Sequence, residues 1–75
     1  MPGILERDLL RTSLAVAERH VAEAEHEVAR QRMIVAGLAL RGRDSGRATQ
    51  LLRRFEKLLA MHVADRDRLR KELGL

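Results

Sequence analysis

Residues 41–46, Arg-Gly-Arg-Asp-Ser-Gly, separate two long runs of regularly spaced apolar residues in this chain of 75 residues. Before this stretch, mostly apolar side chains recur every three or four residues from Leu10 to Leu38, with Gln31 among them. After it the same spacing runs from Ala48 to Leu73, interrupted only by His62 and Arg66. A spacing that alternates between three and four residues places one stripe of side chains along an α-helix. The sequence therefore predicts two α-helices joined by a short turn.

The turn residues suit the end of one helix and the start of the next. Gly42 lacks a Cβ, so it can adopt the left-handed conformation that ends many helices. Asp44 or Ser45 can accept hydrogen bonds from the first free N–H groups of the second helix. A short turn makes the two helices antiparallel neighbours. We predict one all-α domain over residues 1–75, an antiparallel two-helix hairpin with a first helix over 4–41 or 13–41, a turn at 42–44 and a second helix over 45–73.

The predicted hairpin has a definite register. Folding the chain about residues 43 and 44 pairs positions whose numbers add up to 86 or 87, such as Leu14 with Leu73 and Ala17 with Leu69. Small residues of the first helix then repeatedly meet large residues of the second, as a tight coiled-coil-like seam requires. This agreement supports the register independently of the apolar spacing.

One position of the seam is a histidine. The register places His62 opposite Ala24, where the ring nitrogens need a hydrogen-bonding partner, and Glu27, Asp65 or a second copy of the chain can supply one. With Gln31 and Arg66, His62 is expected to form a polar layer that sets register and oligomeric state. A pH-sensitive role for His62 is the weaker reading.

Length and composition limit the kind of protein. A chain of this size buries only about 60% of the surface that its unfolded form exposes, so it usually needs disulfides, a metal or oligomerisation. It has no cysteine, which fits a reducing compartment. The first residues carry acidic groups where an export signal is basic, and no window matches the roughly 18 uncharged apolar residues of a membrane span. We therefore expect a soluble cytoplasmic protein without a membrane partner.

The two predicted helices have more apolar residues than one seam can bury. Alanines recur beside the first stripe, and the segment around Leu9 and Leu10 lies largely beyond the reach of Leu75. Two-fold homodimers are the commonest assemblies that cover such surface. We predict a homodimeric four-helix bundle. The predicted interface consists of Leu9, Leu10, Ala15, Ala22, Ala29, Leu51, Leu58 and His62.

Charge is distributed unevenly along the chain. Residues 1–27 hold three arginines against six acidic residues, whereas residues 28–57 hold eight basic residues against two acidic ones. The turn end is therefore basic, and a nucleic acid is one possible partner. The single aromatic residue, Phe55, falls in the seam and is not available for base stacking, which weakens this interpretation. The candidate contacts are Arg41, Arg43, Arg47 and Arg54. Alternatively, the acidic stretch of one hairpin meets the basic stretch of another.

Motifs for catalysis or cofactor binding are weak. Glu23 and His26 have the Glu-x-x-His spacing of helical metal sites, but both point away from the seam, so we predict no metal ligand. His20 and His26 are interpreted as surface or interface residues. The glycines at 42 and 46 lack the strand that precedes a phosphate-binding loop. We expect neither a cofactor nor an enzymatic activity.

Two segments carry a resemblance to known sequences. Residues 17–32 and residues 51–69, with His20, Gln31, His62 and Asp65-Arg66-Asp67-Arg68, resemble a group of short, uncharacterised bacterial proteins. The likeness covers roughly residues 15–73 and implies a helical fold without any activity or site residue. The sequence thus predicts a non-enzymatic oligomerisation or protein-interaction module, and a small nucleic-acid-binding regulator is the alternative. A different protein that folds against the hairpin is a third possible partner.

Overall fold

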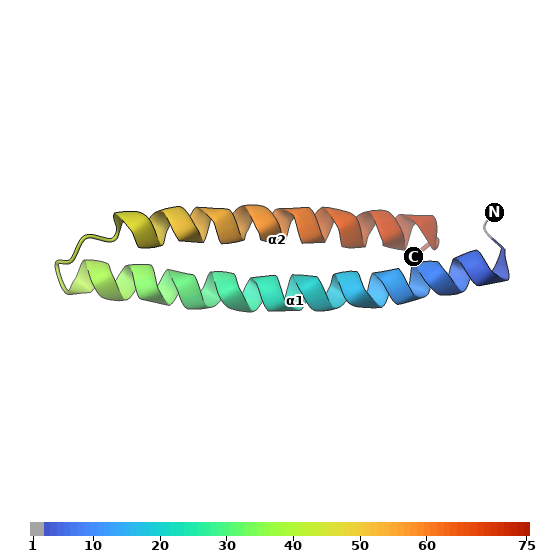
Figure 1. The fold of residues 1–75 in the computed structure, drawn as a ribbon, viewed down its shortest axis with the longest axis horizontal. Coiled ribbons are helices and arrows are strands. Elements are labelled where there is room, and N and C mark those ends of the chain that lie inside the picture. The colour runs from blue at the N-terminus through green and yellow to red at the C-terminus, as the bar shows by residue number, and fades with distance from the viewer. Residues whose placement is uncertain (1–2) are drawn as a thin grey trace.

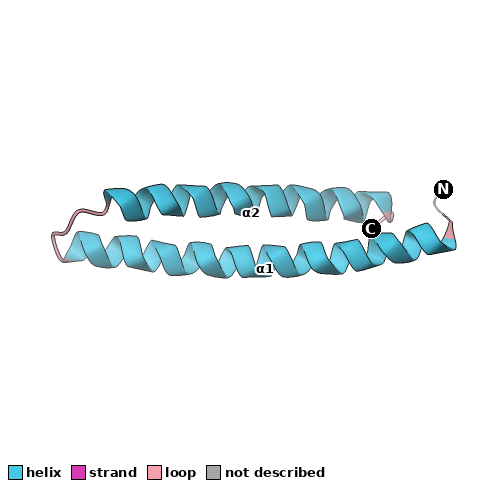
Figure 2. Ribbon diagram, in the orientation of Figure 1, coloured by secondary structure: helices cyan, strands magenta, loops and turns pink. Residues whose placement is uncertain are grey.

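Two long helices make up the computed structural model, which describes residues 3–75 (Figure 1). Helix α1 spans Ile4–Leu40 and helix α2 spans Gly46–Glu72, and the two helices pack side by side. Residues 3–75 contain no strand, as the colouring in Figure 2 shows. The predicted all-α antiparallel hairpin is confirmed. The first helix begins at residue 4 and not at residue 13, and residues 1–2 of the predicted domain lie outside the described residues.

The hairpin is long and only one layer thick. Its extents are 58 × 15 × 13 Å, and its radius of gyration is 17.0 Å. A compact domain of 75 residues has a radius of gyration of about 11 Å. At the open end, away from the turn, α1 runs past the last residues of α2 (Figure 1). Each helix therefore has a single neighbour and leaves most of its circumference exposed.

The turn forms as the glycine and the aspartate predict. Gly42 has a φ of 67°, and its N–H donates to the Ala39 carbonyl at 3.1 Å. The next N–H, of Arg43, donates to the Leu38 carbonyl at 2.9 Å, which completes a Schellman-type helix end. Asp44 Oδ1 accepts a hydrogen bond from the Gly46 N–H at 2.8 Å. Ser45 makes no such side-chain bond, so Asp44 is the residue that caps α2.

The core lies along the seam and is best closed at the open end. Leu14, Ala17, Leu69 and Leu73 form one buried cluster, which contains both members of the predicted pairs Leu14–Leu73 and Ala17–Leu69. Val21, Ala24 and Val28 continue the buried stripe along α1. Towards the turn, the seam residues of both helices are only half-buried: Val35, Leu38, Ala48, Leu52, Phe55 and Leu59. The apolar contact between the helices is therefore incomplete over the half of the hairpin nearest the turn.

The start of α1 is only partly tied to α2. Ile4, Leu5 and Leu9 are exposed, as expected for a segment without a neighbour in the same chain. The prediction that Leu10 lacks an intramolecular partner is wrong, because Leu10 packs against the buried cluster that includes Leu73. The guanidinium of Arg7 also donates to the Leu73 carbonyl at 3.3 Å. Contact with α2 thus extends to about the second turn of α1.

Candidate functional site

One side of the hairpin is crossed by two ion pairs. Arg70 of α2 lies 3.3 Å from Glu18 of α1, and Arg32 of α1 lies 3.4 Å from Glu56 of α2. All four side chains are well exposed, so each pair contributes only modestly to stability. The long side chains nevertheless bridge the two helices along this side. We call it the ion-paired face.

The opposite side of the hairpin carries grooves. Residues five positions apart lie about 140° apart around an α-helix. Ser13 and Glu27 of α1 are five residues before Glu18 and Arg32, so they lie on the other side of the seam. On α2, Leu51 and Asp65 are related to Glu56 and Arg70 in the same way. The grooves occur along these stripes, and we call this side the grooved face.

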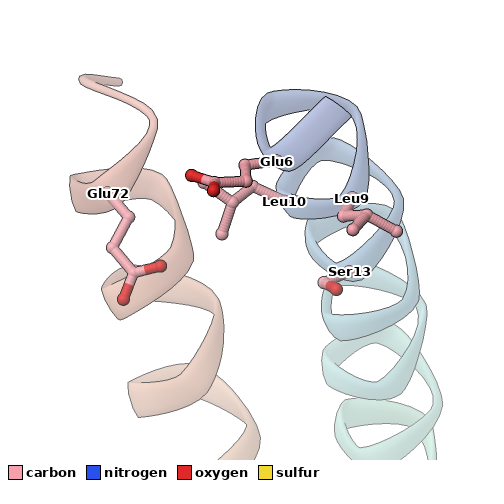
Figure 3. Close-up of a pocket in the computed structure, with 5 residues that line it drawn as sticks. All are labelled: Glu6, Leu9, Leu10, Ser13 and Glu72. Carbon is pink, nitrogen blue, oxygen red and sulfur yellow. The ribbon is translucent and has the colours of Figure 1, made fainter. Parts of the chain in front are cut away.

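Two grooves of this face lie near its two ends. The groove at the open end has a volume of about 510 Å³. Its lining consists of Glu6, Leu9, Leu10, Ser13 and Glu72. Figure 3 shows Glu6 and Leu10 directed from α1 towards α2, which contributes Glu72. The groove nearer the turn is lined by Glu27, Arg30, Gln31, Ile34, Leu51 and Phe55. Both grooves are bounded by side chains of the two helices together.

Large apolar side chains are exposed on the grooved face. Leu51 is 40% exposed and Ile34 is 43% exposed beside the same groove. Leu58 is 45% exposed and lies seven residues after Leu51 and seven before Asp65, so it belongs to the same stripe of α2. Within residues 3–75, no ion pair joins α1 to α2 across this face. Its apolar surface is therefore open to a partner.

The histidine of the seam meets a second histidine. The rings of His62 and His20 lie 5.0 Å apart between centroids and are tilted by 55°. No hydrogen bond joins His62 to Glu27 or Asp65 among the described residues, and a hydrogen bond to a second copy of the chain stays a prediction. His20, predicted to be a surface or interface residue, is the aromatic neighbour of His62. His20 also lines a groove together with Asp65. The available signal was that His20 precedes Ala24, the predicted neighbour of His62, by one helical turn.

The expected polar layer is not a single layer. Gln31 is only 6% exposed, and its Nε2 donates to the Ala48 carbonyl at 2.9 Å. Arg66 forms an ion pair with the adjacent Asp67 at 3.1 Å. The three polar seam residues therefore make separate contacts. Among residues 3–75, no group of three or more histidine, cysteine or acidic side chains is placed to hold a metal ion.

The residues of the predicted interface divide between the two sides of the hairpin. Leu9 and Leu10 line the groove at the open end, and Leu51 and His62 line grooves along α2. Leu58 lies on the same stripe of α2 as Leu51. The three alanines are exposed but line none of these grooves. Ala22 lies one turn after Glu18, and Ala29 lies three residues before Arg32, so the alanines flank the ion-paired face. These three alanines are Ala15, Ala22 and Ala29.

The arginines at the turn end are exposed and lie close together along the chain. Arg41, Arg43, Arg47 and Arg54 take part in none of the ion pairs within the described part of the chain. Arg68, near the open end, is different, because it contacts both Asp65 and Glu72. The hydrogen bond from Arg68 to Asp65, with the charge of that carboxylate, raises the pKa of the Arg68 guanidinium above its ordinary value. The free positive charges of the grooved face therefore lie towards the turn.

Comparison with family models, with curated proteins and with solved structures gives no match to this chain. No relative thus supplies a function or a site residue, and the resemblance to short bacterial proteins stays a prediction. Neither α1 nor α2 is long and apolar enough to cross a membrane. The two faces of the hairpin and its basic turn end are therefore the candidate functional surfaces.

Proposed function

We propose that this chain is a non-enzymatic helical association module, and that two copies pair into a four-helix bundle. The observation that carries the proposal is the exposed area. The hairpin exposes 6052 Å², whereas a compact monomer of 8.5 kDa exposes about 4,700 Å². A hairpin with one seam has no further element of its own to cover the excess.

Pairing of two copies accounts for this excess. A compact particle of twice the mass exposes about 7,700 Å², which is roughly 4,000 Å² less than two separate hairpins. Obligate homodimers bury areas of this order. The half-buried seam residues near the turn support the same proposal, because a second layer of helices would complete their burial. The interface includes members of the predicted set on the grooved face, among them Leu51 and Leu58.

The molar mass in solution tests the association. Light scattering on the purified chain is expected to give twice 8.5 kDa at micromolar concentration. The reason is that the exposed leucines of each copy lose their contact with water on pairing, a favourable transfer of apolar surface. A mass that stays at 8.5 kDa up to hundreds of micromolar would contradict the proposal.

A second candidate function, binding to a nucleic acid, rests on the basic turn end. Four exposed arginines without an ion pair in the described part of the chain supply the positive charge that a phosphate backbone requires. No exposed aromatic residue accompanies them in the chain, so contacts to phosphates would dominate over base stacking. Such binding would weaken steeply as the salt concentration rises.

Charge neutralisation tests this second function. We expect heparin or RNA binding, where it occurs, to be lost when four turn-end arginines are replaced by glutamine. These are Arg41, Arg43, Arg47 and Arg54. A control with the same change in charge replaces four exposed basic residues elsewhere: Arg11, Arg19, Lys57 and Lys71. Equal losses in the two variants, measured as a function of salt, would indicate non-specific attraction and would contradict a site at the turn end.

A further inference from the structure

We infer that the second copy docks on the grooved face in an antiparallel orientation, so that the turn end of each hairpin covers the open end of its partner. This inference rests on the proposed self-association and specifies its surface and direction. It commits to one occupant, another copy of the same chain, and it follows from the apolar surface, the charges and the shape of the described residues.

The choice of face follows from what each side of the seam exposes. On the ion-paired face, four charged side chains lie across the two helices. A partner on that side would remove these charges from water, at a free-energy cost that their mutual attraction does not reliably offset. The corresponding positions of the grooved face include the charged residues Glu27 and Asp65, but no ion pair joins the two helices across this face within the described residues. Three large apolar side chains are exposed on it, Leu51, Leu58 and Ile34, and their burial is favourable. The grooved face is therefore the side on which a second layer of helices gains most.

The charges of the grooved face differ between its two ends. At the open end, the grooves are lined by three carboxylates and one guanidinium: Glu6, Asp65, Glu72 and Arg68. Towards the turn, Arg30 and Arg41 of the first half of the chain line a groove. On α2, Met61 and Arg68 line another groove, and Arg47 and Arg54 lie on the same side of the helix because they precede these two residues at intervals of seven. Glu27 is the acidic residue that lines a groove in this half of the face. The open end is thus negative and the turn end positive.

This polarity selects the orientation of the pair. A parallel arrangement would place the four arginines of one turn end beside the same four of its partner. An antiparallel arrangement about a two-fold axis brings the negative end of each copy to the positive end of the other, and it does so twice. Complementary charge fixes the orientation of an interface and disfavours the alternatives by like-charge repulsion. The antiparallel pair is therefore the one that the charges favour.

The shape of the two ends agrees with this orientation. Leu9, which is 68% exposed, lies on α1 at the open end, beside the last turn of α2, and Figure 3 shows it near the level of Glu72. At the turn end, Met33, Ile34 and Gly37 line a groove on the same side of α1, and a Cβ at Gly37 would meet no atom within 4 Å. When two hairpins overlap fully, the midpoint of α1 near residue 22 lies at the two-fold axis. Leu9 of each copy then lies level with residues 35–36 of its partner, beside the groove at Gly37.

Distances between spin labels on the intact chain test the orientation. The chain has no cysteine, so Ser45→Cys at the turn and Ala15→Cys near the open end, which lines none of the grooves, each give one labelling site per copy with little change in side-chain size. In the antiparallel pair with full overlap, two Ser45→Cys labels are expected at a separation comparable to the 58 Å length of the hairpin. Two Ala15→Cys labels are expected to be offset by only about 21 Å along the helix axis, from a rise of 1.5 Å per residue, so their separation is the shorter one.

The outcomes separate the inference from the proposed function. In a dimer, a Ser45→Cys separation of about 10–20 Å indicates parallel hairpins and overturns the inference, while self-association stands. If the distance between the two labels is the same in both variants, the two-fold axis of the pair lies nearer the turn than residue 22. This result overturns the docking of Leu9 beside Gly37. A chain that light scattering shows to be monomeric before it is labelled overturns the proposed function itself. The expected long and short separations, in a chain of doubled mass, support both.

Discussion

The substitution Leu58→Glu is expected to raise the dissociation constant of the dimer by about 100-fold or more. Leu58 lies at the middle of the exposed stripe of the grooved face and is 45% exposed in the single hairpin. A glutamate there remains hydrated in the monomer, but it would have to lose water on pairing, which costs several kcal/mol for an unpaired charge. A loss of about 2.7 kcal/mol already corresponds to 100-fold. Sedimentation equilibrium gives the dissociation constant, and circular dichroism shows whether the helices persist.

Ala22→Glu is the matched control for this substitution. It introduces the same carboxylate at an exposed position that flanks the ion-paired face, one turn after Glu18. We expect the dimer to form with an affinity within a few fold of that of the unchanged chain. The repulsion between glutamates one turn apart costs only about 0.2–0.5 kcal/mol. If Ala22→Glu dissociates the dimer and Leu58→Glu does not, the second copy docks on the other face.

The substitution His62→Leu is expected to raise the temperature of unfolding by about 5–10 °C. His62 is half-buried in the seam, and its ring contacts the ring of His20. A leucine at this position would bury apolar surface in place of a polar ring, and about 1 kcal/mol shifts the midpoint of a domain this small by about 4–8 °C. The gain in stability has a cost in specificity, because polar residues in a helical seam limit the number of alternative registers and assemblies. We therefore also expect a broader distribution of oligomers.

Thermal unfolding followed by circular dichroism, together with light scattering, measures both effects. His26→Leu is the control, because His26 is an exposed residue of α1 outside the grooves described above. Its unfolding temperature is expected to stay close to that of the unchanged chain. A His62→Leu chain that is less stable and forms one species of dimer would contradict this account of the seam.

The helices and their turn could be predicted because the physical causes are local. The apolar spacing of three and four residues specifies a stripe on each helix, whatever that stripe later contacts. Gly42 ends α1 because a residue without a Cβ takes a positive φ at little cost, and Asp44 caps α2 with its own side chain. The sequence does not decide between residues 4 and 13 as the start of α1, and the structure places it at Ile4.

The candidate site was predicted less completely. The exposed leucines were recognised as surplus to the seam, but they were grouped with alanines that lie near the other face. The charged residues that flank the seam distinguish the ion-paired face from the grooved face. Glu18 and Arg32 are spaced to meet Arg70 and Glu56, whereas the flanking stripes of the other side include Leu51, Leu58 and Ile34 and, within the described residues, no ion pair between the helices. A comparison of these flanking positions would have separated the two faces before the structure did.

By itself, the sequence determined two α-helices, the place and type of the turn, and an excess of apolar residues over one seam, because spacing, φ preference and composition act within a few residues of the chain. Only the tertiary structure decided that His20 meets His62, that Leu10 joins the buried cluster and that one face is ion-paired while the other is grooved. These contacts join residues more than 20 positions apart, so they depend on the rotation and stagger of one helix against the other. A pattern within one helix does not contain those two quantities.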